Sequence, residues 1–533
     1  MSVVSFVYGL AVGLVGFLVV NKILRYIKNV GRPPLPPGPK GLPLVGNLND
    51  LPKSGAFEAQ HWAKHKELYG PISSVTIMGQ TIVIISDLEL AIDVLEKRAV
   101  KHSSRPKQIF AGEIIGWQNS LAFLQYNDRF RAYRKSISRI IGTKVAASQY
   151  DTLQEAEVGH FLLHVLENPD SLIRHIKRFA GSVILKIAYG YNPEPFEDDY
   201  LIDKVGETMD DFGRAAVPGA FLVDMFPLLR HVPEWFPGTA WKQTGKRWGA
   251  TLKTVADKPF AFVKHQLSQG KQNASLVSQF LGNGHLTSEE EFVTKWSALS
   301  LYTGGADTTV SSIACFFLAM TVFPKVQQKA QEEIDRVVGQ DRLPTAADRP
   351  NLPYVDALVK ELLRWQPVAP MGLPHTSSDD DVVEGYFIPR DAMILPNIWQ
   401  VVYFTRDPKL YEDPAEFRPE RFLPTDGSEP PTDPHKFVFG FGRRVCPGRI
   451  LADNALFINI AQSLAVFNIS KRVEDGREVE PTIKMAPGII THPEHFETSI
   501  KPRSYKHEQL IRSVEKTYPW EESDAKTLQE MRI

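Results

Sequence analysis

The stretch FVFGFGRRVCPGRILA, residues 437–452, decides the interpretation of this sequence. It contains Cys446, one of only two cysteines in a chain of 533 residues, and a proline follows this cysteine directly. Because proline favours the first position of a helix, we expect the apolar stretch GRILADNALFINIAQSLAVF to form a helix with Cys446 at its N-terminus. The free N–H groups and the dipole of that helix would stabilise a thiolate.

The residues around Cys446 suit a large, flat ligand. The stretch has three glycines that allow a tight turn and close approach to the backbone, Gly440, Gly442 and Gly448. Arg443 and Arg444 could neutralise anionic groups of the ligand. A single axial thiolate is one of the few ways in which proteins hold haem iron. A buried structural cysteine and a nucleophile near His435 are the alternatives.

The loop pattern resembles the haem-binding signature of the cytochrome P450 family, the haem-thiolate monooxygenases. The resemblance implies haem b, with Cys446 as the axial thiolate ligand of the iron. It also assigns four further residues of the loop to cofactor binding, Phe439, Gly440, Arg444 and Gly448. A histidine ligand would be the alternative, but none of the 14 histidines has a comparable set of glycines and arginines around it. The resemblance covers residues 32–502 and implies a mainly α fold with a small β subdomain.

A long apolar stretch from Phe292 to Phe323 is interrupted by GGADTT, residues 304–309. As a helix it would be about 48 Å long, enough to cross a domain. The adjacent glycines weaken such a helix and open its wall to a ligand. By the resemblance, Asp307 and Thr308 are catalytic residues that deliver protons to reduced dioxygen. The alternative is a glycine kink in which the threonine hydroxyl bonds to the preceding turn.

Glu361 and Arg364 lie three residues apart in LPYVDALVKELLRW and would share one helix face. By default such a pair lies on the surface and contributes little. In the resembling family it is buried and held by a second arginine, which Arg421 matches here. We therefore assign these three residues a structural role.

The segment NDRFRAYRKSISRI, residues 127–140, resembles the helix whose tryptophan and arginine contact the haem propionates. Phe130 stands where the tryptophan is usual and lacks its N–H, so Arg134 should carry more of that contact. His375 matches a second position that often meets a propionate, although a lone histidine is usually structural. Three basic residues spaced for one helix face, Arg131, Lys135 and Arg139, would form the docking face for a reductase.

The resemblance also indicates where substrate binds. The substrate-facing positions are Phe110, Trp117, Phe123, Phe212, Gly304, Val368, Met371 and Ile489. Such apolar residues suit a hydrophobic substrate, although they would also be normal in a core. Residues 218–238 resemble fungal members, which oxidise secondary metabolites or xenobiotics.

The first 20 residues carry no charge and are long enough to span a bilayer as a helix. They precede four basic residues, Lys22, Arg25, Lys28 and Arg32. This flank predicts that the remainder of the chain is cytosolic. A cleaved secretory signal would need basic residues before the apolar core instead. We expect four units: a transmembrane signal anchor (1–21), a basic flank with a Pro-rich hinge (22–49), a catalytic domain (50–502) and a surface tail (503–533).

These predictions describe a single-pass protein of the endoplasmic reticulum membrane that uses O2 and electrons from NADPH-cytochrome P450 reductase. The net charge of −1 gives no reason to expect nucleic-acid binding. Two alternatives keep the fold and change the function. One is a haem-thiolate isomerase or dehydratase without O2 activation. The other is a haem-free lipid-binding protein.

Overall fold

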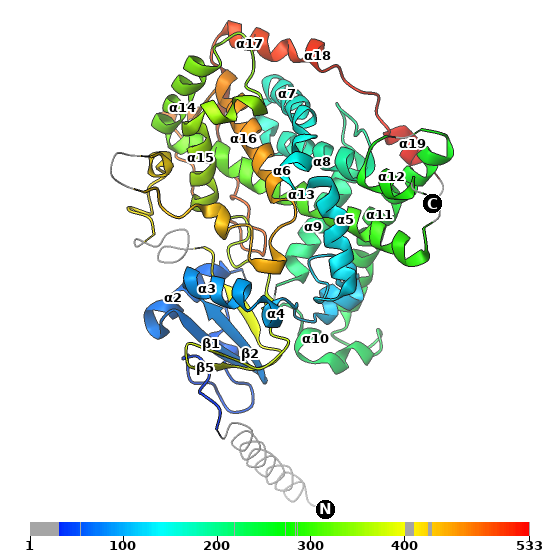
Figure 1. The fold of residues 1–533 in the computed structure, drawn as a ribbon, viewed down its shortest axis with the longest axis vertical. Coiled ribbons are helices and arrows are strands. Elements are labelled where there is room, and N and C mark those ends of the chain that lie inside the picture. The colour runs from blue at the N-terminus through cyan, green and yellow to red at the C-terminus, as the bar shows by residue number, and fades with distance from the viewer. Residues whose placement is uncertain are drawn as a thin grey trace, which may run out of the picture.

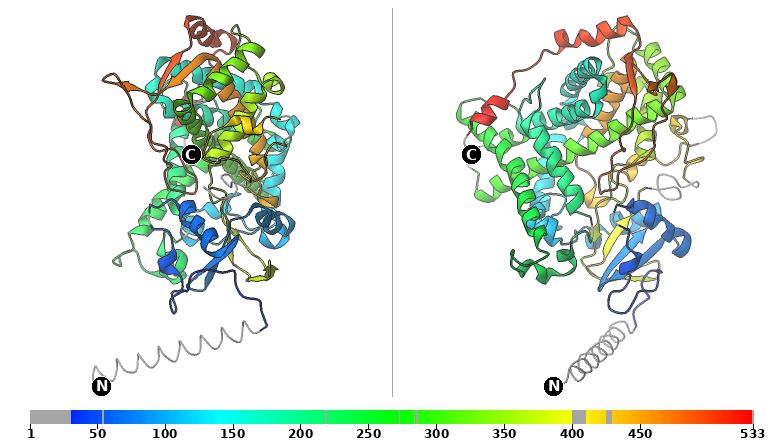
Figure 2. Two further views of the ribbon diagram at one scale, coloured as in Figure 1. Left: turned by 90° about the vertical axis from the view of Figure 1, so that its left-hand side faces the viewer. Right: turned by 180° about the vertical axis from the view of Figure 1, so that it is seen from behind.

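The computed structural model describes residues 31–531, apart from residues 54, 218, 272, 283, 285, 400–409 and 425–428. The expected transmembrane anchor, residues 1–21, lies outside the described residues. A large helical part and a smaller β-rich part lie at opposite ends of the long axis (Figure 1), and the two further views agree (Figure 2). This arrangement is the mainly α fold with a small β subdomain that the sequence predicts.

The helices alternate between long core helices and short connecting ones. In chain order they are α2 (Glu58–Tyr69), α3 (Leu88–Ile92), α4 (Ala99–His102), α5 (Asp128–Ile141), α6 (Lys144–Ser148), α7 (Asp151–Glu167), α8 (Leu172–Tyr189), α9 (Tyr200–Ala215), α10 (Leu222–Met225), α11 (Ala240–Ser268), α12 (Leu276–Leu281), α13 (Ser288–Val322), α14 (Pro324–Val337), α15 (Pro353–Trp365), α16 (Arg449–Val466), α17 (Tyr505–Arg512), α18 (Val514–Thr517) and α19 (Ala525–Glu530). Helices α14 and α15 cover the stretches 325–338 and 352–365, in which apolar residues recur at helical spacing.

The main sheet has the strand order β1-β2-β6-β3. Its strands are β1 (Ile72–Ile77), β2 (Gln80–Ile85), β6 (Met393–Pro396) and β3 (His375–Thr376). Strands β1 and β2 form a hairpin, and Met78 and Gly79 between them have φ of +48° and +93°. Positive φ at both turn residues is typical of the tight turns that match strand twist. Smaller pairs are β4 (Asp381–Val383) with β5 (Tyr386–Ile388), β7 (Phe467–Ser470) with β10 (Ser499–Pro502), and β8 (Val473–Glu474) with β9 (Arg477–Glu478).

The Pro-rich segment before residue 50 covers the edge of this sheet. The backbone N–H of Ser74 in β1 donates to the Pro37 carbonyl at 2.9 Å. The N–H of Thr76 donates to Asn47 Oδ1 at 2.9 Å, and the Asn47 N–H returns a bond to the Thr76 carbonyl. An edge strand needs such partners, so the folded domain begins within the segment predicted as a hinge.

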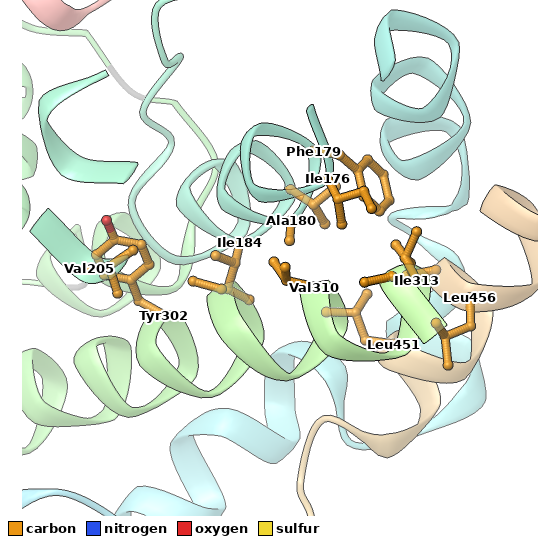
Figure 3. Packing of buried hydrophobic residues seen from close by; sticks show 14 of the residues in the cluster. Ile176, Phe179, Ala180, Ile184, Val205, Tyr302, Val310, Ile313, Leu451 and Leu456 are labelled. Atoms are coloured by element: carbon orange, nitrogen blue, oxygen red, sulfur yellow. The ribbon is translucent and has the colours of Figure 1, made fainter. Parts of the chain in front are cut away.

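Helix α13 forms the centre of the helical part. It begins with a capping box of Thr287 and Glu290 and runs for 35 residues. Figure 3 shows Ile184 of α8 and Leu451 of α16 packed around Val310 and its neighbours on α13. This helix is long and apolar enough to cross a membrane, but its apolar window is mostly buried in the protein core.

The tail beyond residue 502 is folded on the surface. It runs from α17 over the top of the molecule to α19 near α11 (Figure 1). Ile511, Val514 and Leu528 are buried, and Trp520 stacks on His160 of α7 with ring centres 3.9 Å apart. These contacts fasten the tail across α7.

Candidate active site

The loop that carries Cys446 is closed by its own backbone. The Cys446 N–H donates to the Phe439 carbonyl at 2.8 Å. Gly442 has φ of +52°, and a Cβ there would strike the Leu95 carbonyl, so only glycine fits. The following helix α16 begins at Arg449, with Gly448 as its N-cap. The prediction that Pro447 is the first helical residue is therefore wrong, because the turn through Gly448 delays the helix.

The Cys446 thiol is set in an electropositive environment deep in the protein. Burial raises its pKa, while a hydrogen bond from the Gly448 backbone N–H and the charges of Arg134 and Arg449 act in the opposite direction. The backbone contact and the two cations therefore favour a thiolate, and burial opposes it. A bound metal cation would resolve this conflict, because a coordinating thiol is deprotonated.

Arg444 is buried two residues before Cys446, and its guanidinium donates hydrogen bonds only to backbone carbonyls among the described residues. It donates to the carbonyls of Ser103 at 2.6 Å, Leu121 at 3.3 Å and Leu124 at 2.5 Å. Burial, and next the charges of Arg105 and Arg134, lower the pKa of Arg444 to about 8. Its neighbour Arg443 is exposed instead and lies over the Tyr126 ring at 4.8 Å.

Arg105 is a second buried guanidinium beside Arg444, and the sequence interpretation missed it. It donates to the carbonyls of Ala122 at 3.0 Å, Leu373 at 2.8 Å and Pro374 at 2.7 Å. Burial lowers its pKa to about 9. Its sequence context, SSRP, carries no signal that would distinguish it from a surface arginine, since only the fold brings residue 105 beside residue 444.

His375 and Arg134 lie beside these two guanidinium groups. His375 is buried on β3 and donates from Nδ1 to the His102 carbonyl at 2.8 Å. Burial, and next the charge of Arg105, hold its pKa well below the usual value. Arg134 of α5 donates to the Val445 carbonyl at 2.5 Å, and burial lowers its pKa.

Buried cations without a counter-ion are costly, and proteins normally pair them. Among the described residues, the hydrogen bonds of Arg105, Arg134 and Arg444 go to backbone carbonyls and none goes to a carboxylate. A ligand with two carboxylates, such as the propionates of haem, would supply the missing charge. The residues present therefore fit a haem whose iron is held by Cys446.

The middle of α13 borders open space although the helix lies in the core. Gly304 is exposed, between a buried Thr303 and a half-buried Gly305, and a Cβ added to it would meet no atom within 4 Å. A Cβ on Gly305 would instead lie 2.9 Å from the Ile184 side chain. Only Gly304 therefore opens the wall as predicted, while Gly305 lets α8 pack closely.

Two polar groups follow at this opening. The Thr308 hydroxyl donates to the Gly304 carbonyl at 2.6 Å, which is the back-bonded geometry considered above as an alternative. Asp307 forms an ion pair with His492, whose Nε2 lies 3.0 Å from Asp307 Oδ1. The sequence interpretation did not include His492, which lies far along the chain from the helix.

Glu361, Arg364 and Arg421 form a buried ionic cluster. Arg364 makes two bonds to the Glu361 carboxylate, at 2.7 and 2.8 Å, and both side chains are 0% exposed. Arg421 lies 3.2 Å from Glu361 Oε2. The arginines also donate to backbone carbonyls, among them that of Glu416. This geometry agrees with the structural role expected for the three residues.

The expected substrate-facing residues fall into two groups. Gly304, Phe123 and Val368 have exposed surface. The others are buried, namely Phe110, Trp117, Phe212, Met371 and Ile489. The rings of Trp117 and Phe123 both meet that of Phe212, with centres 4.8 and 5.9 Å apart.

Phe110 and Met371 both lie in packed surroundings, and their place in a substrate pocket stays a prediction. It is fully buried, and its ring stacks on Phe221 with centres 3.5 Å apart. Met371 belongs to the apolar cluster beneath the sheet, with Trp62 and Met393. Apolar character alone could not separate core residues from pocket residues.

Comparison with known proteins gives a consistent result. The family model described as Cytochrome P450 matches residues 36–500. The chain is 47% identical to cytochrome P450 monooxygenase ppsD of Aspergillus oryzae, covering 98% of both chains. It is 47% identical to cytochrome P450 monooxygenase claR of Ampulloclitocybe clavipes, over 94% of this chain and 92% of the relative. It is 41% identical to the O-methylsterigmatocystin oxidoreductase of Aspergillus flavus, over 96% of each chain.

Proposed function

The chain belongs to the cytochrome P450 family and is a haem-thiolate monooxygenase, and on that premise we propose how its own residues serve the reaction. The enzyme inserts one atom of O2 into a hydrophobic organic substrate and takes electrons from a redox partner. Haem b, when bound, supplies the binding and reductive activation of O2. Cys446 would hold its iron, with Phe439, Gly440 and Gly448 shaping the loop around it.

The uncompensated cluster of Arg105, Arg134 and Arg444, with the neutral His375 beside it, is the observation that carries this proposal. Two propionates placed among these groups would form charge-assisted hydrogen bonds, which are about twice as strong as neutral ones. The same bonds would fix the plane of the cofactor over Cys446. Phe130 contributes a ring face to Arg444 at 4.0 Å and no hydrogen bond of its own side chain.

Asp307 and Thr308 would manage protons at the opening beside Gly304. Proton delivery needs a carboxyl group and a hydroxyl within reach of the reacting oxygen, and bulk water must stay out. The Thr308 hydroxyl donates its hydrogen to a helix carbonyl. The lone pairs of its oxygen therefore remain able to accept a hydrogen bond from a water that carries the proton. The buried rings of Trp117 and Phe212 would exclude solvent on the substrate side.

We propose attachment to the endoplasmic reticulum membrane through the apolar segment at residues 1–21. A second apolar surface supports this proposal. Leu228 and Trp235, in the segment after α10, are 81% and 82% exposed, and Leu42 near the start of the described chain is 52% exposed. Helix α10 and the first described residues lie at the same end of the molecule (Figure 1), where both could meet a bilayer.

The electron donor would be NADPH-cytochrome P450 reductase, docking on α5. The side chains of Arg131, Lys135 and Arg139 are exposed on this helix. A basic face would speed encounter with an acidic partner. We propose a substrate from fungal secondary metabolism. One relative is named as an oxidoreductase of O-methylsterigmatocystin, and apolar side chains surround the expected pocket.

The proposal on the cofactor is tested by replacing each of the two cysteines. Cys446→Ala should abolish the ferrous–CO absorption band of the thiolate-ligated enzyme, while Cys315→Ala should keep it. Cys315 is the matched control because it is buried in α13, and burial raises its pKa to about 12. A normal ferrous–CO absorption band in the Cys446→Ala protein would show that Cys446 is not the ligand of the iron. Screening apolar compounds by the shift of the haem spectrum would then narrow the substrate class.

Neither alternative function is favoured. The relatives are named monooxygenases and oxidoreductases, not isomerases or dehydratases. A haem-free lipid-binding protein would have no use for buried cations beside a buried thiol.

A further inference from the structure

His492 is held against Asp307 by the backbone on both sides of it. The hydroxyl of Ser311, one helical turn after Asp307, donates to the Thr491 carbonyl. The Thr491 N–H donates to the Val368 carbonyl at 2.9 Å, and the Ala486 N–H donates to the His492 carbonyl at 2.8 Å. Because the chain is fixed immediately before and at His492, the imidazole is presented to Asp307 by a rigid loop.

The pairing uses one side of the Asp307 carboxylate. Nε2 of His492 lies 3.0 Å from Oδ1, and the two side chains keep 33% and 19% of their surfaces accessible. In the described chain, His492 is the one ion-pair partner of Asp307. The geometry therefore places the imidazole against Oδ1, and Oδ2 is left for exchange with water or with Thr308.

From this geometry we infer that His492 is a positioning residue for proton delivery. The inference rests on the role proposed above for Asp307. The Asp307 carboxylate takes up a proton from solvent and, as a carboxyl group, passes it to a water on the Thr308 side. The carboxylate that this leaves then pairs with His492 again. Without His492 the carboxylate would rotate freely and lose the orientation that this exchange requires.

The inference is tested with the full-length holoenzyme, its reductase and NADPH, without added substrate. The measured quantities are the rate of NADPH oxidation and the hydrogen peroxide released per NADPH. Asp307→Asn should slow oxidation by ~100-fold, at the lower end of what general acid catalysis contributes. His492→Phe should slow it by about tenfold, since the acid remains but is misplaced, and peroxide release should rise. His492→Gln, which retains an N–H donor, should restore most of the rate.

Two controls make the outcome specific. His495→Phe alters an exposed histidine of the same loop and should leave the rate unchanged. The double variant Asp307→Asn/His492→Phe should be no slower than Asp307→Asn alone, because residues that act as one unit are not additive. Multiplied effects in the double variant would overturn the inference, as would a wild-type rate for His492→Phe. Asp307→Asn at the wild-type rate would overturn the role of Asp307 itself.

A spectroscopic measurement distinguishes a misplaced Asp307 from a general loss of structure. Carbon monoxide bound to the reduced haem reports on the polarity of the oxygen-binding face through its stretching frequency. His492→Phe and Asp307→Asn should shift this frequency, while His492→Gln and His495→Phe should not. An unchanged frequency in His492→Phe would show that the imidazole does not control Asp307.

Discussion

The guanidinium carbon of Arg444 lies 4.0 Å from the centre of the Phe130 ring, on the side of the protein where the cysteine loop meets α5. A cation over an aromatic face is attracted by the ring quadrupole, and more strongly when water is excluded. Phe130 therefore holds the arginine in place although it cannot donate a hydrogen bond. The loss of the usual tryptophan N–H would leave the arginines as the propionate donors, and this makes their individual contributions testable.

Arg105→Leu should lower haem retention. Losing a charge-assisted hydrogen bond costs about 1.5–3 kcal/mol, which corresponds to roughly ten- to a hundredfold faster haem loss. Haem transfer to an excess of a haem-free acceptor protein would measure this rate. Arg105→Lys should retain part of the affinity through its charge. Arg443→Leu is the matched control because Arg443 is exposed, and it should behave as wild type. Equal haem loss from Arg105→Leu and Arg443→Leu would contradict the cluster.

His435 should make stability depend on pH. Its two ring nitrogens lie 2.7 Å from Asp433 and 2.9 Å from Asp453. Burial acts to lower its pKa, but these two carboxylates dominate together and raise it to about 9. Because the folded-state pKa exceeds the unfolded value near 6.5, the stabilisation is complete below pH ~6.5 and is lost as the pH rises through about 9.

The contribution of His435 would be on the order of 3 kcal/mol at most, from a shift of this size. Thermal midpoints at pH 6.5 and 9.5, in ~0.1 M salt, would measure it. The wild-type midpoint should fall across this interval by more than that of His435→Gln. If the thermal midpoint fell by the same amount in both proteins, the two carboxylates would not be binding a charged imidazole.

Much of the fold could be predicted because its signals are local. The helical periods at 325–338 and 352–365, and the Met-Gly turn of the first hairpin, depend on residues close in sequence. The start of α16 could not be placed, since proline at 447 is compatible with a turn as well as with a first helical position. The role of the segment before residue 50 depends on the exposed edge of β1, which no local pattern reveals.

The candidate site also contains some residues that local sequence motifs reveal and others that only the fold reveals. Cys446 and the Glu361 cluster follow from short motifs, whereas Arg105 and His492 become visible only when distant segments meet. For Phe110 neither the sequence nor its burial decides the role, because an apolar residue that lines a pocket looks the same in sequence as one that packs behind it. Charged residues from distant segments that meet in the fold can therefore be identified from the structure, but not from the sequence pattern.

Glu361→Gln should be strongly destabilising. The change removes the charge that compensates Arg364 and Arg421, whose side chains are 0% and 3% exposed. Leaving a buried charge unpaired costs about 3–5 kcal/mol. The yield of folded, haem-containing protein and its thermal midpoint should both fall. Glu412→Gln, which alters an exposed partner of Arg418, should change the midpoint little. Similar midpoints for the two variants would contradict the cluster's structural role.

Gly304 and Gly305 should respond differently to alanine although they are adjacent. Gly305→Ala places a methyl group 2.9 Å from Ile184 of α8, and overpacking of this kind costs about 1–3 kcal/mol. Gly304→Ala meets no atom within 4 Å, and alanine is favoured over glycine in a helix by about 1 kcal/mol. The thermal midpoint should therefore fall for Gly305→Ala and hold or rise for Gly304→Ala.

A compensating change identifies the cause. Ile184→Ala removes the atoms that the new methyl group would strike, so Gly305→Ala/Ile184→Ala should be more stable than the sum of the two single effects predicts. In Gly304→Ala the methyl group enters the open space beside the helix, and we expect weaker binding of bulky apolar compounds in a haem spectral titration. If Gly305→Ala were as stable as wild type, α8 would not pack against α13 at the observed distance. If Gly304→Ala were strongly destabilised, the space beside residue 304 would already be filled by protein atoms.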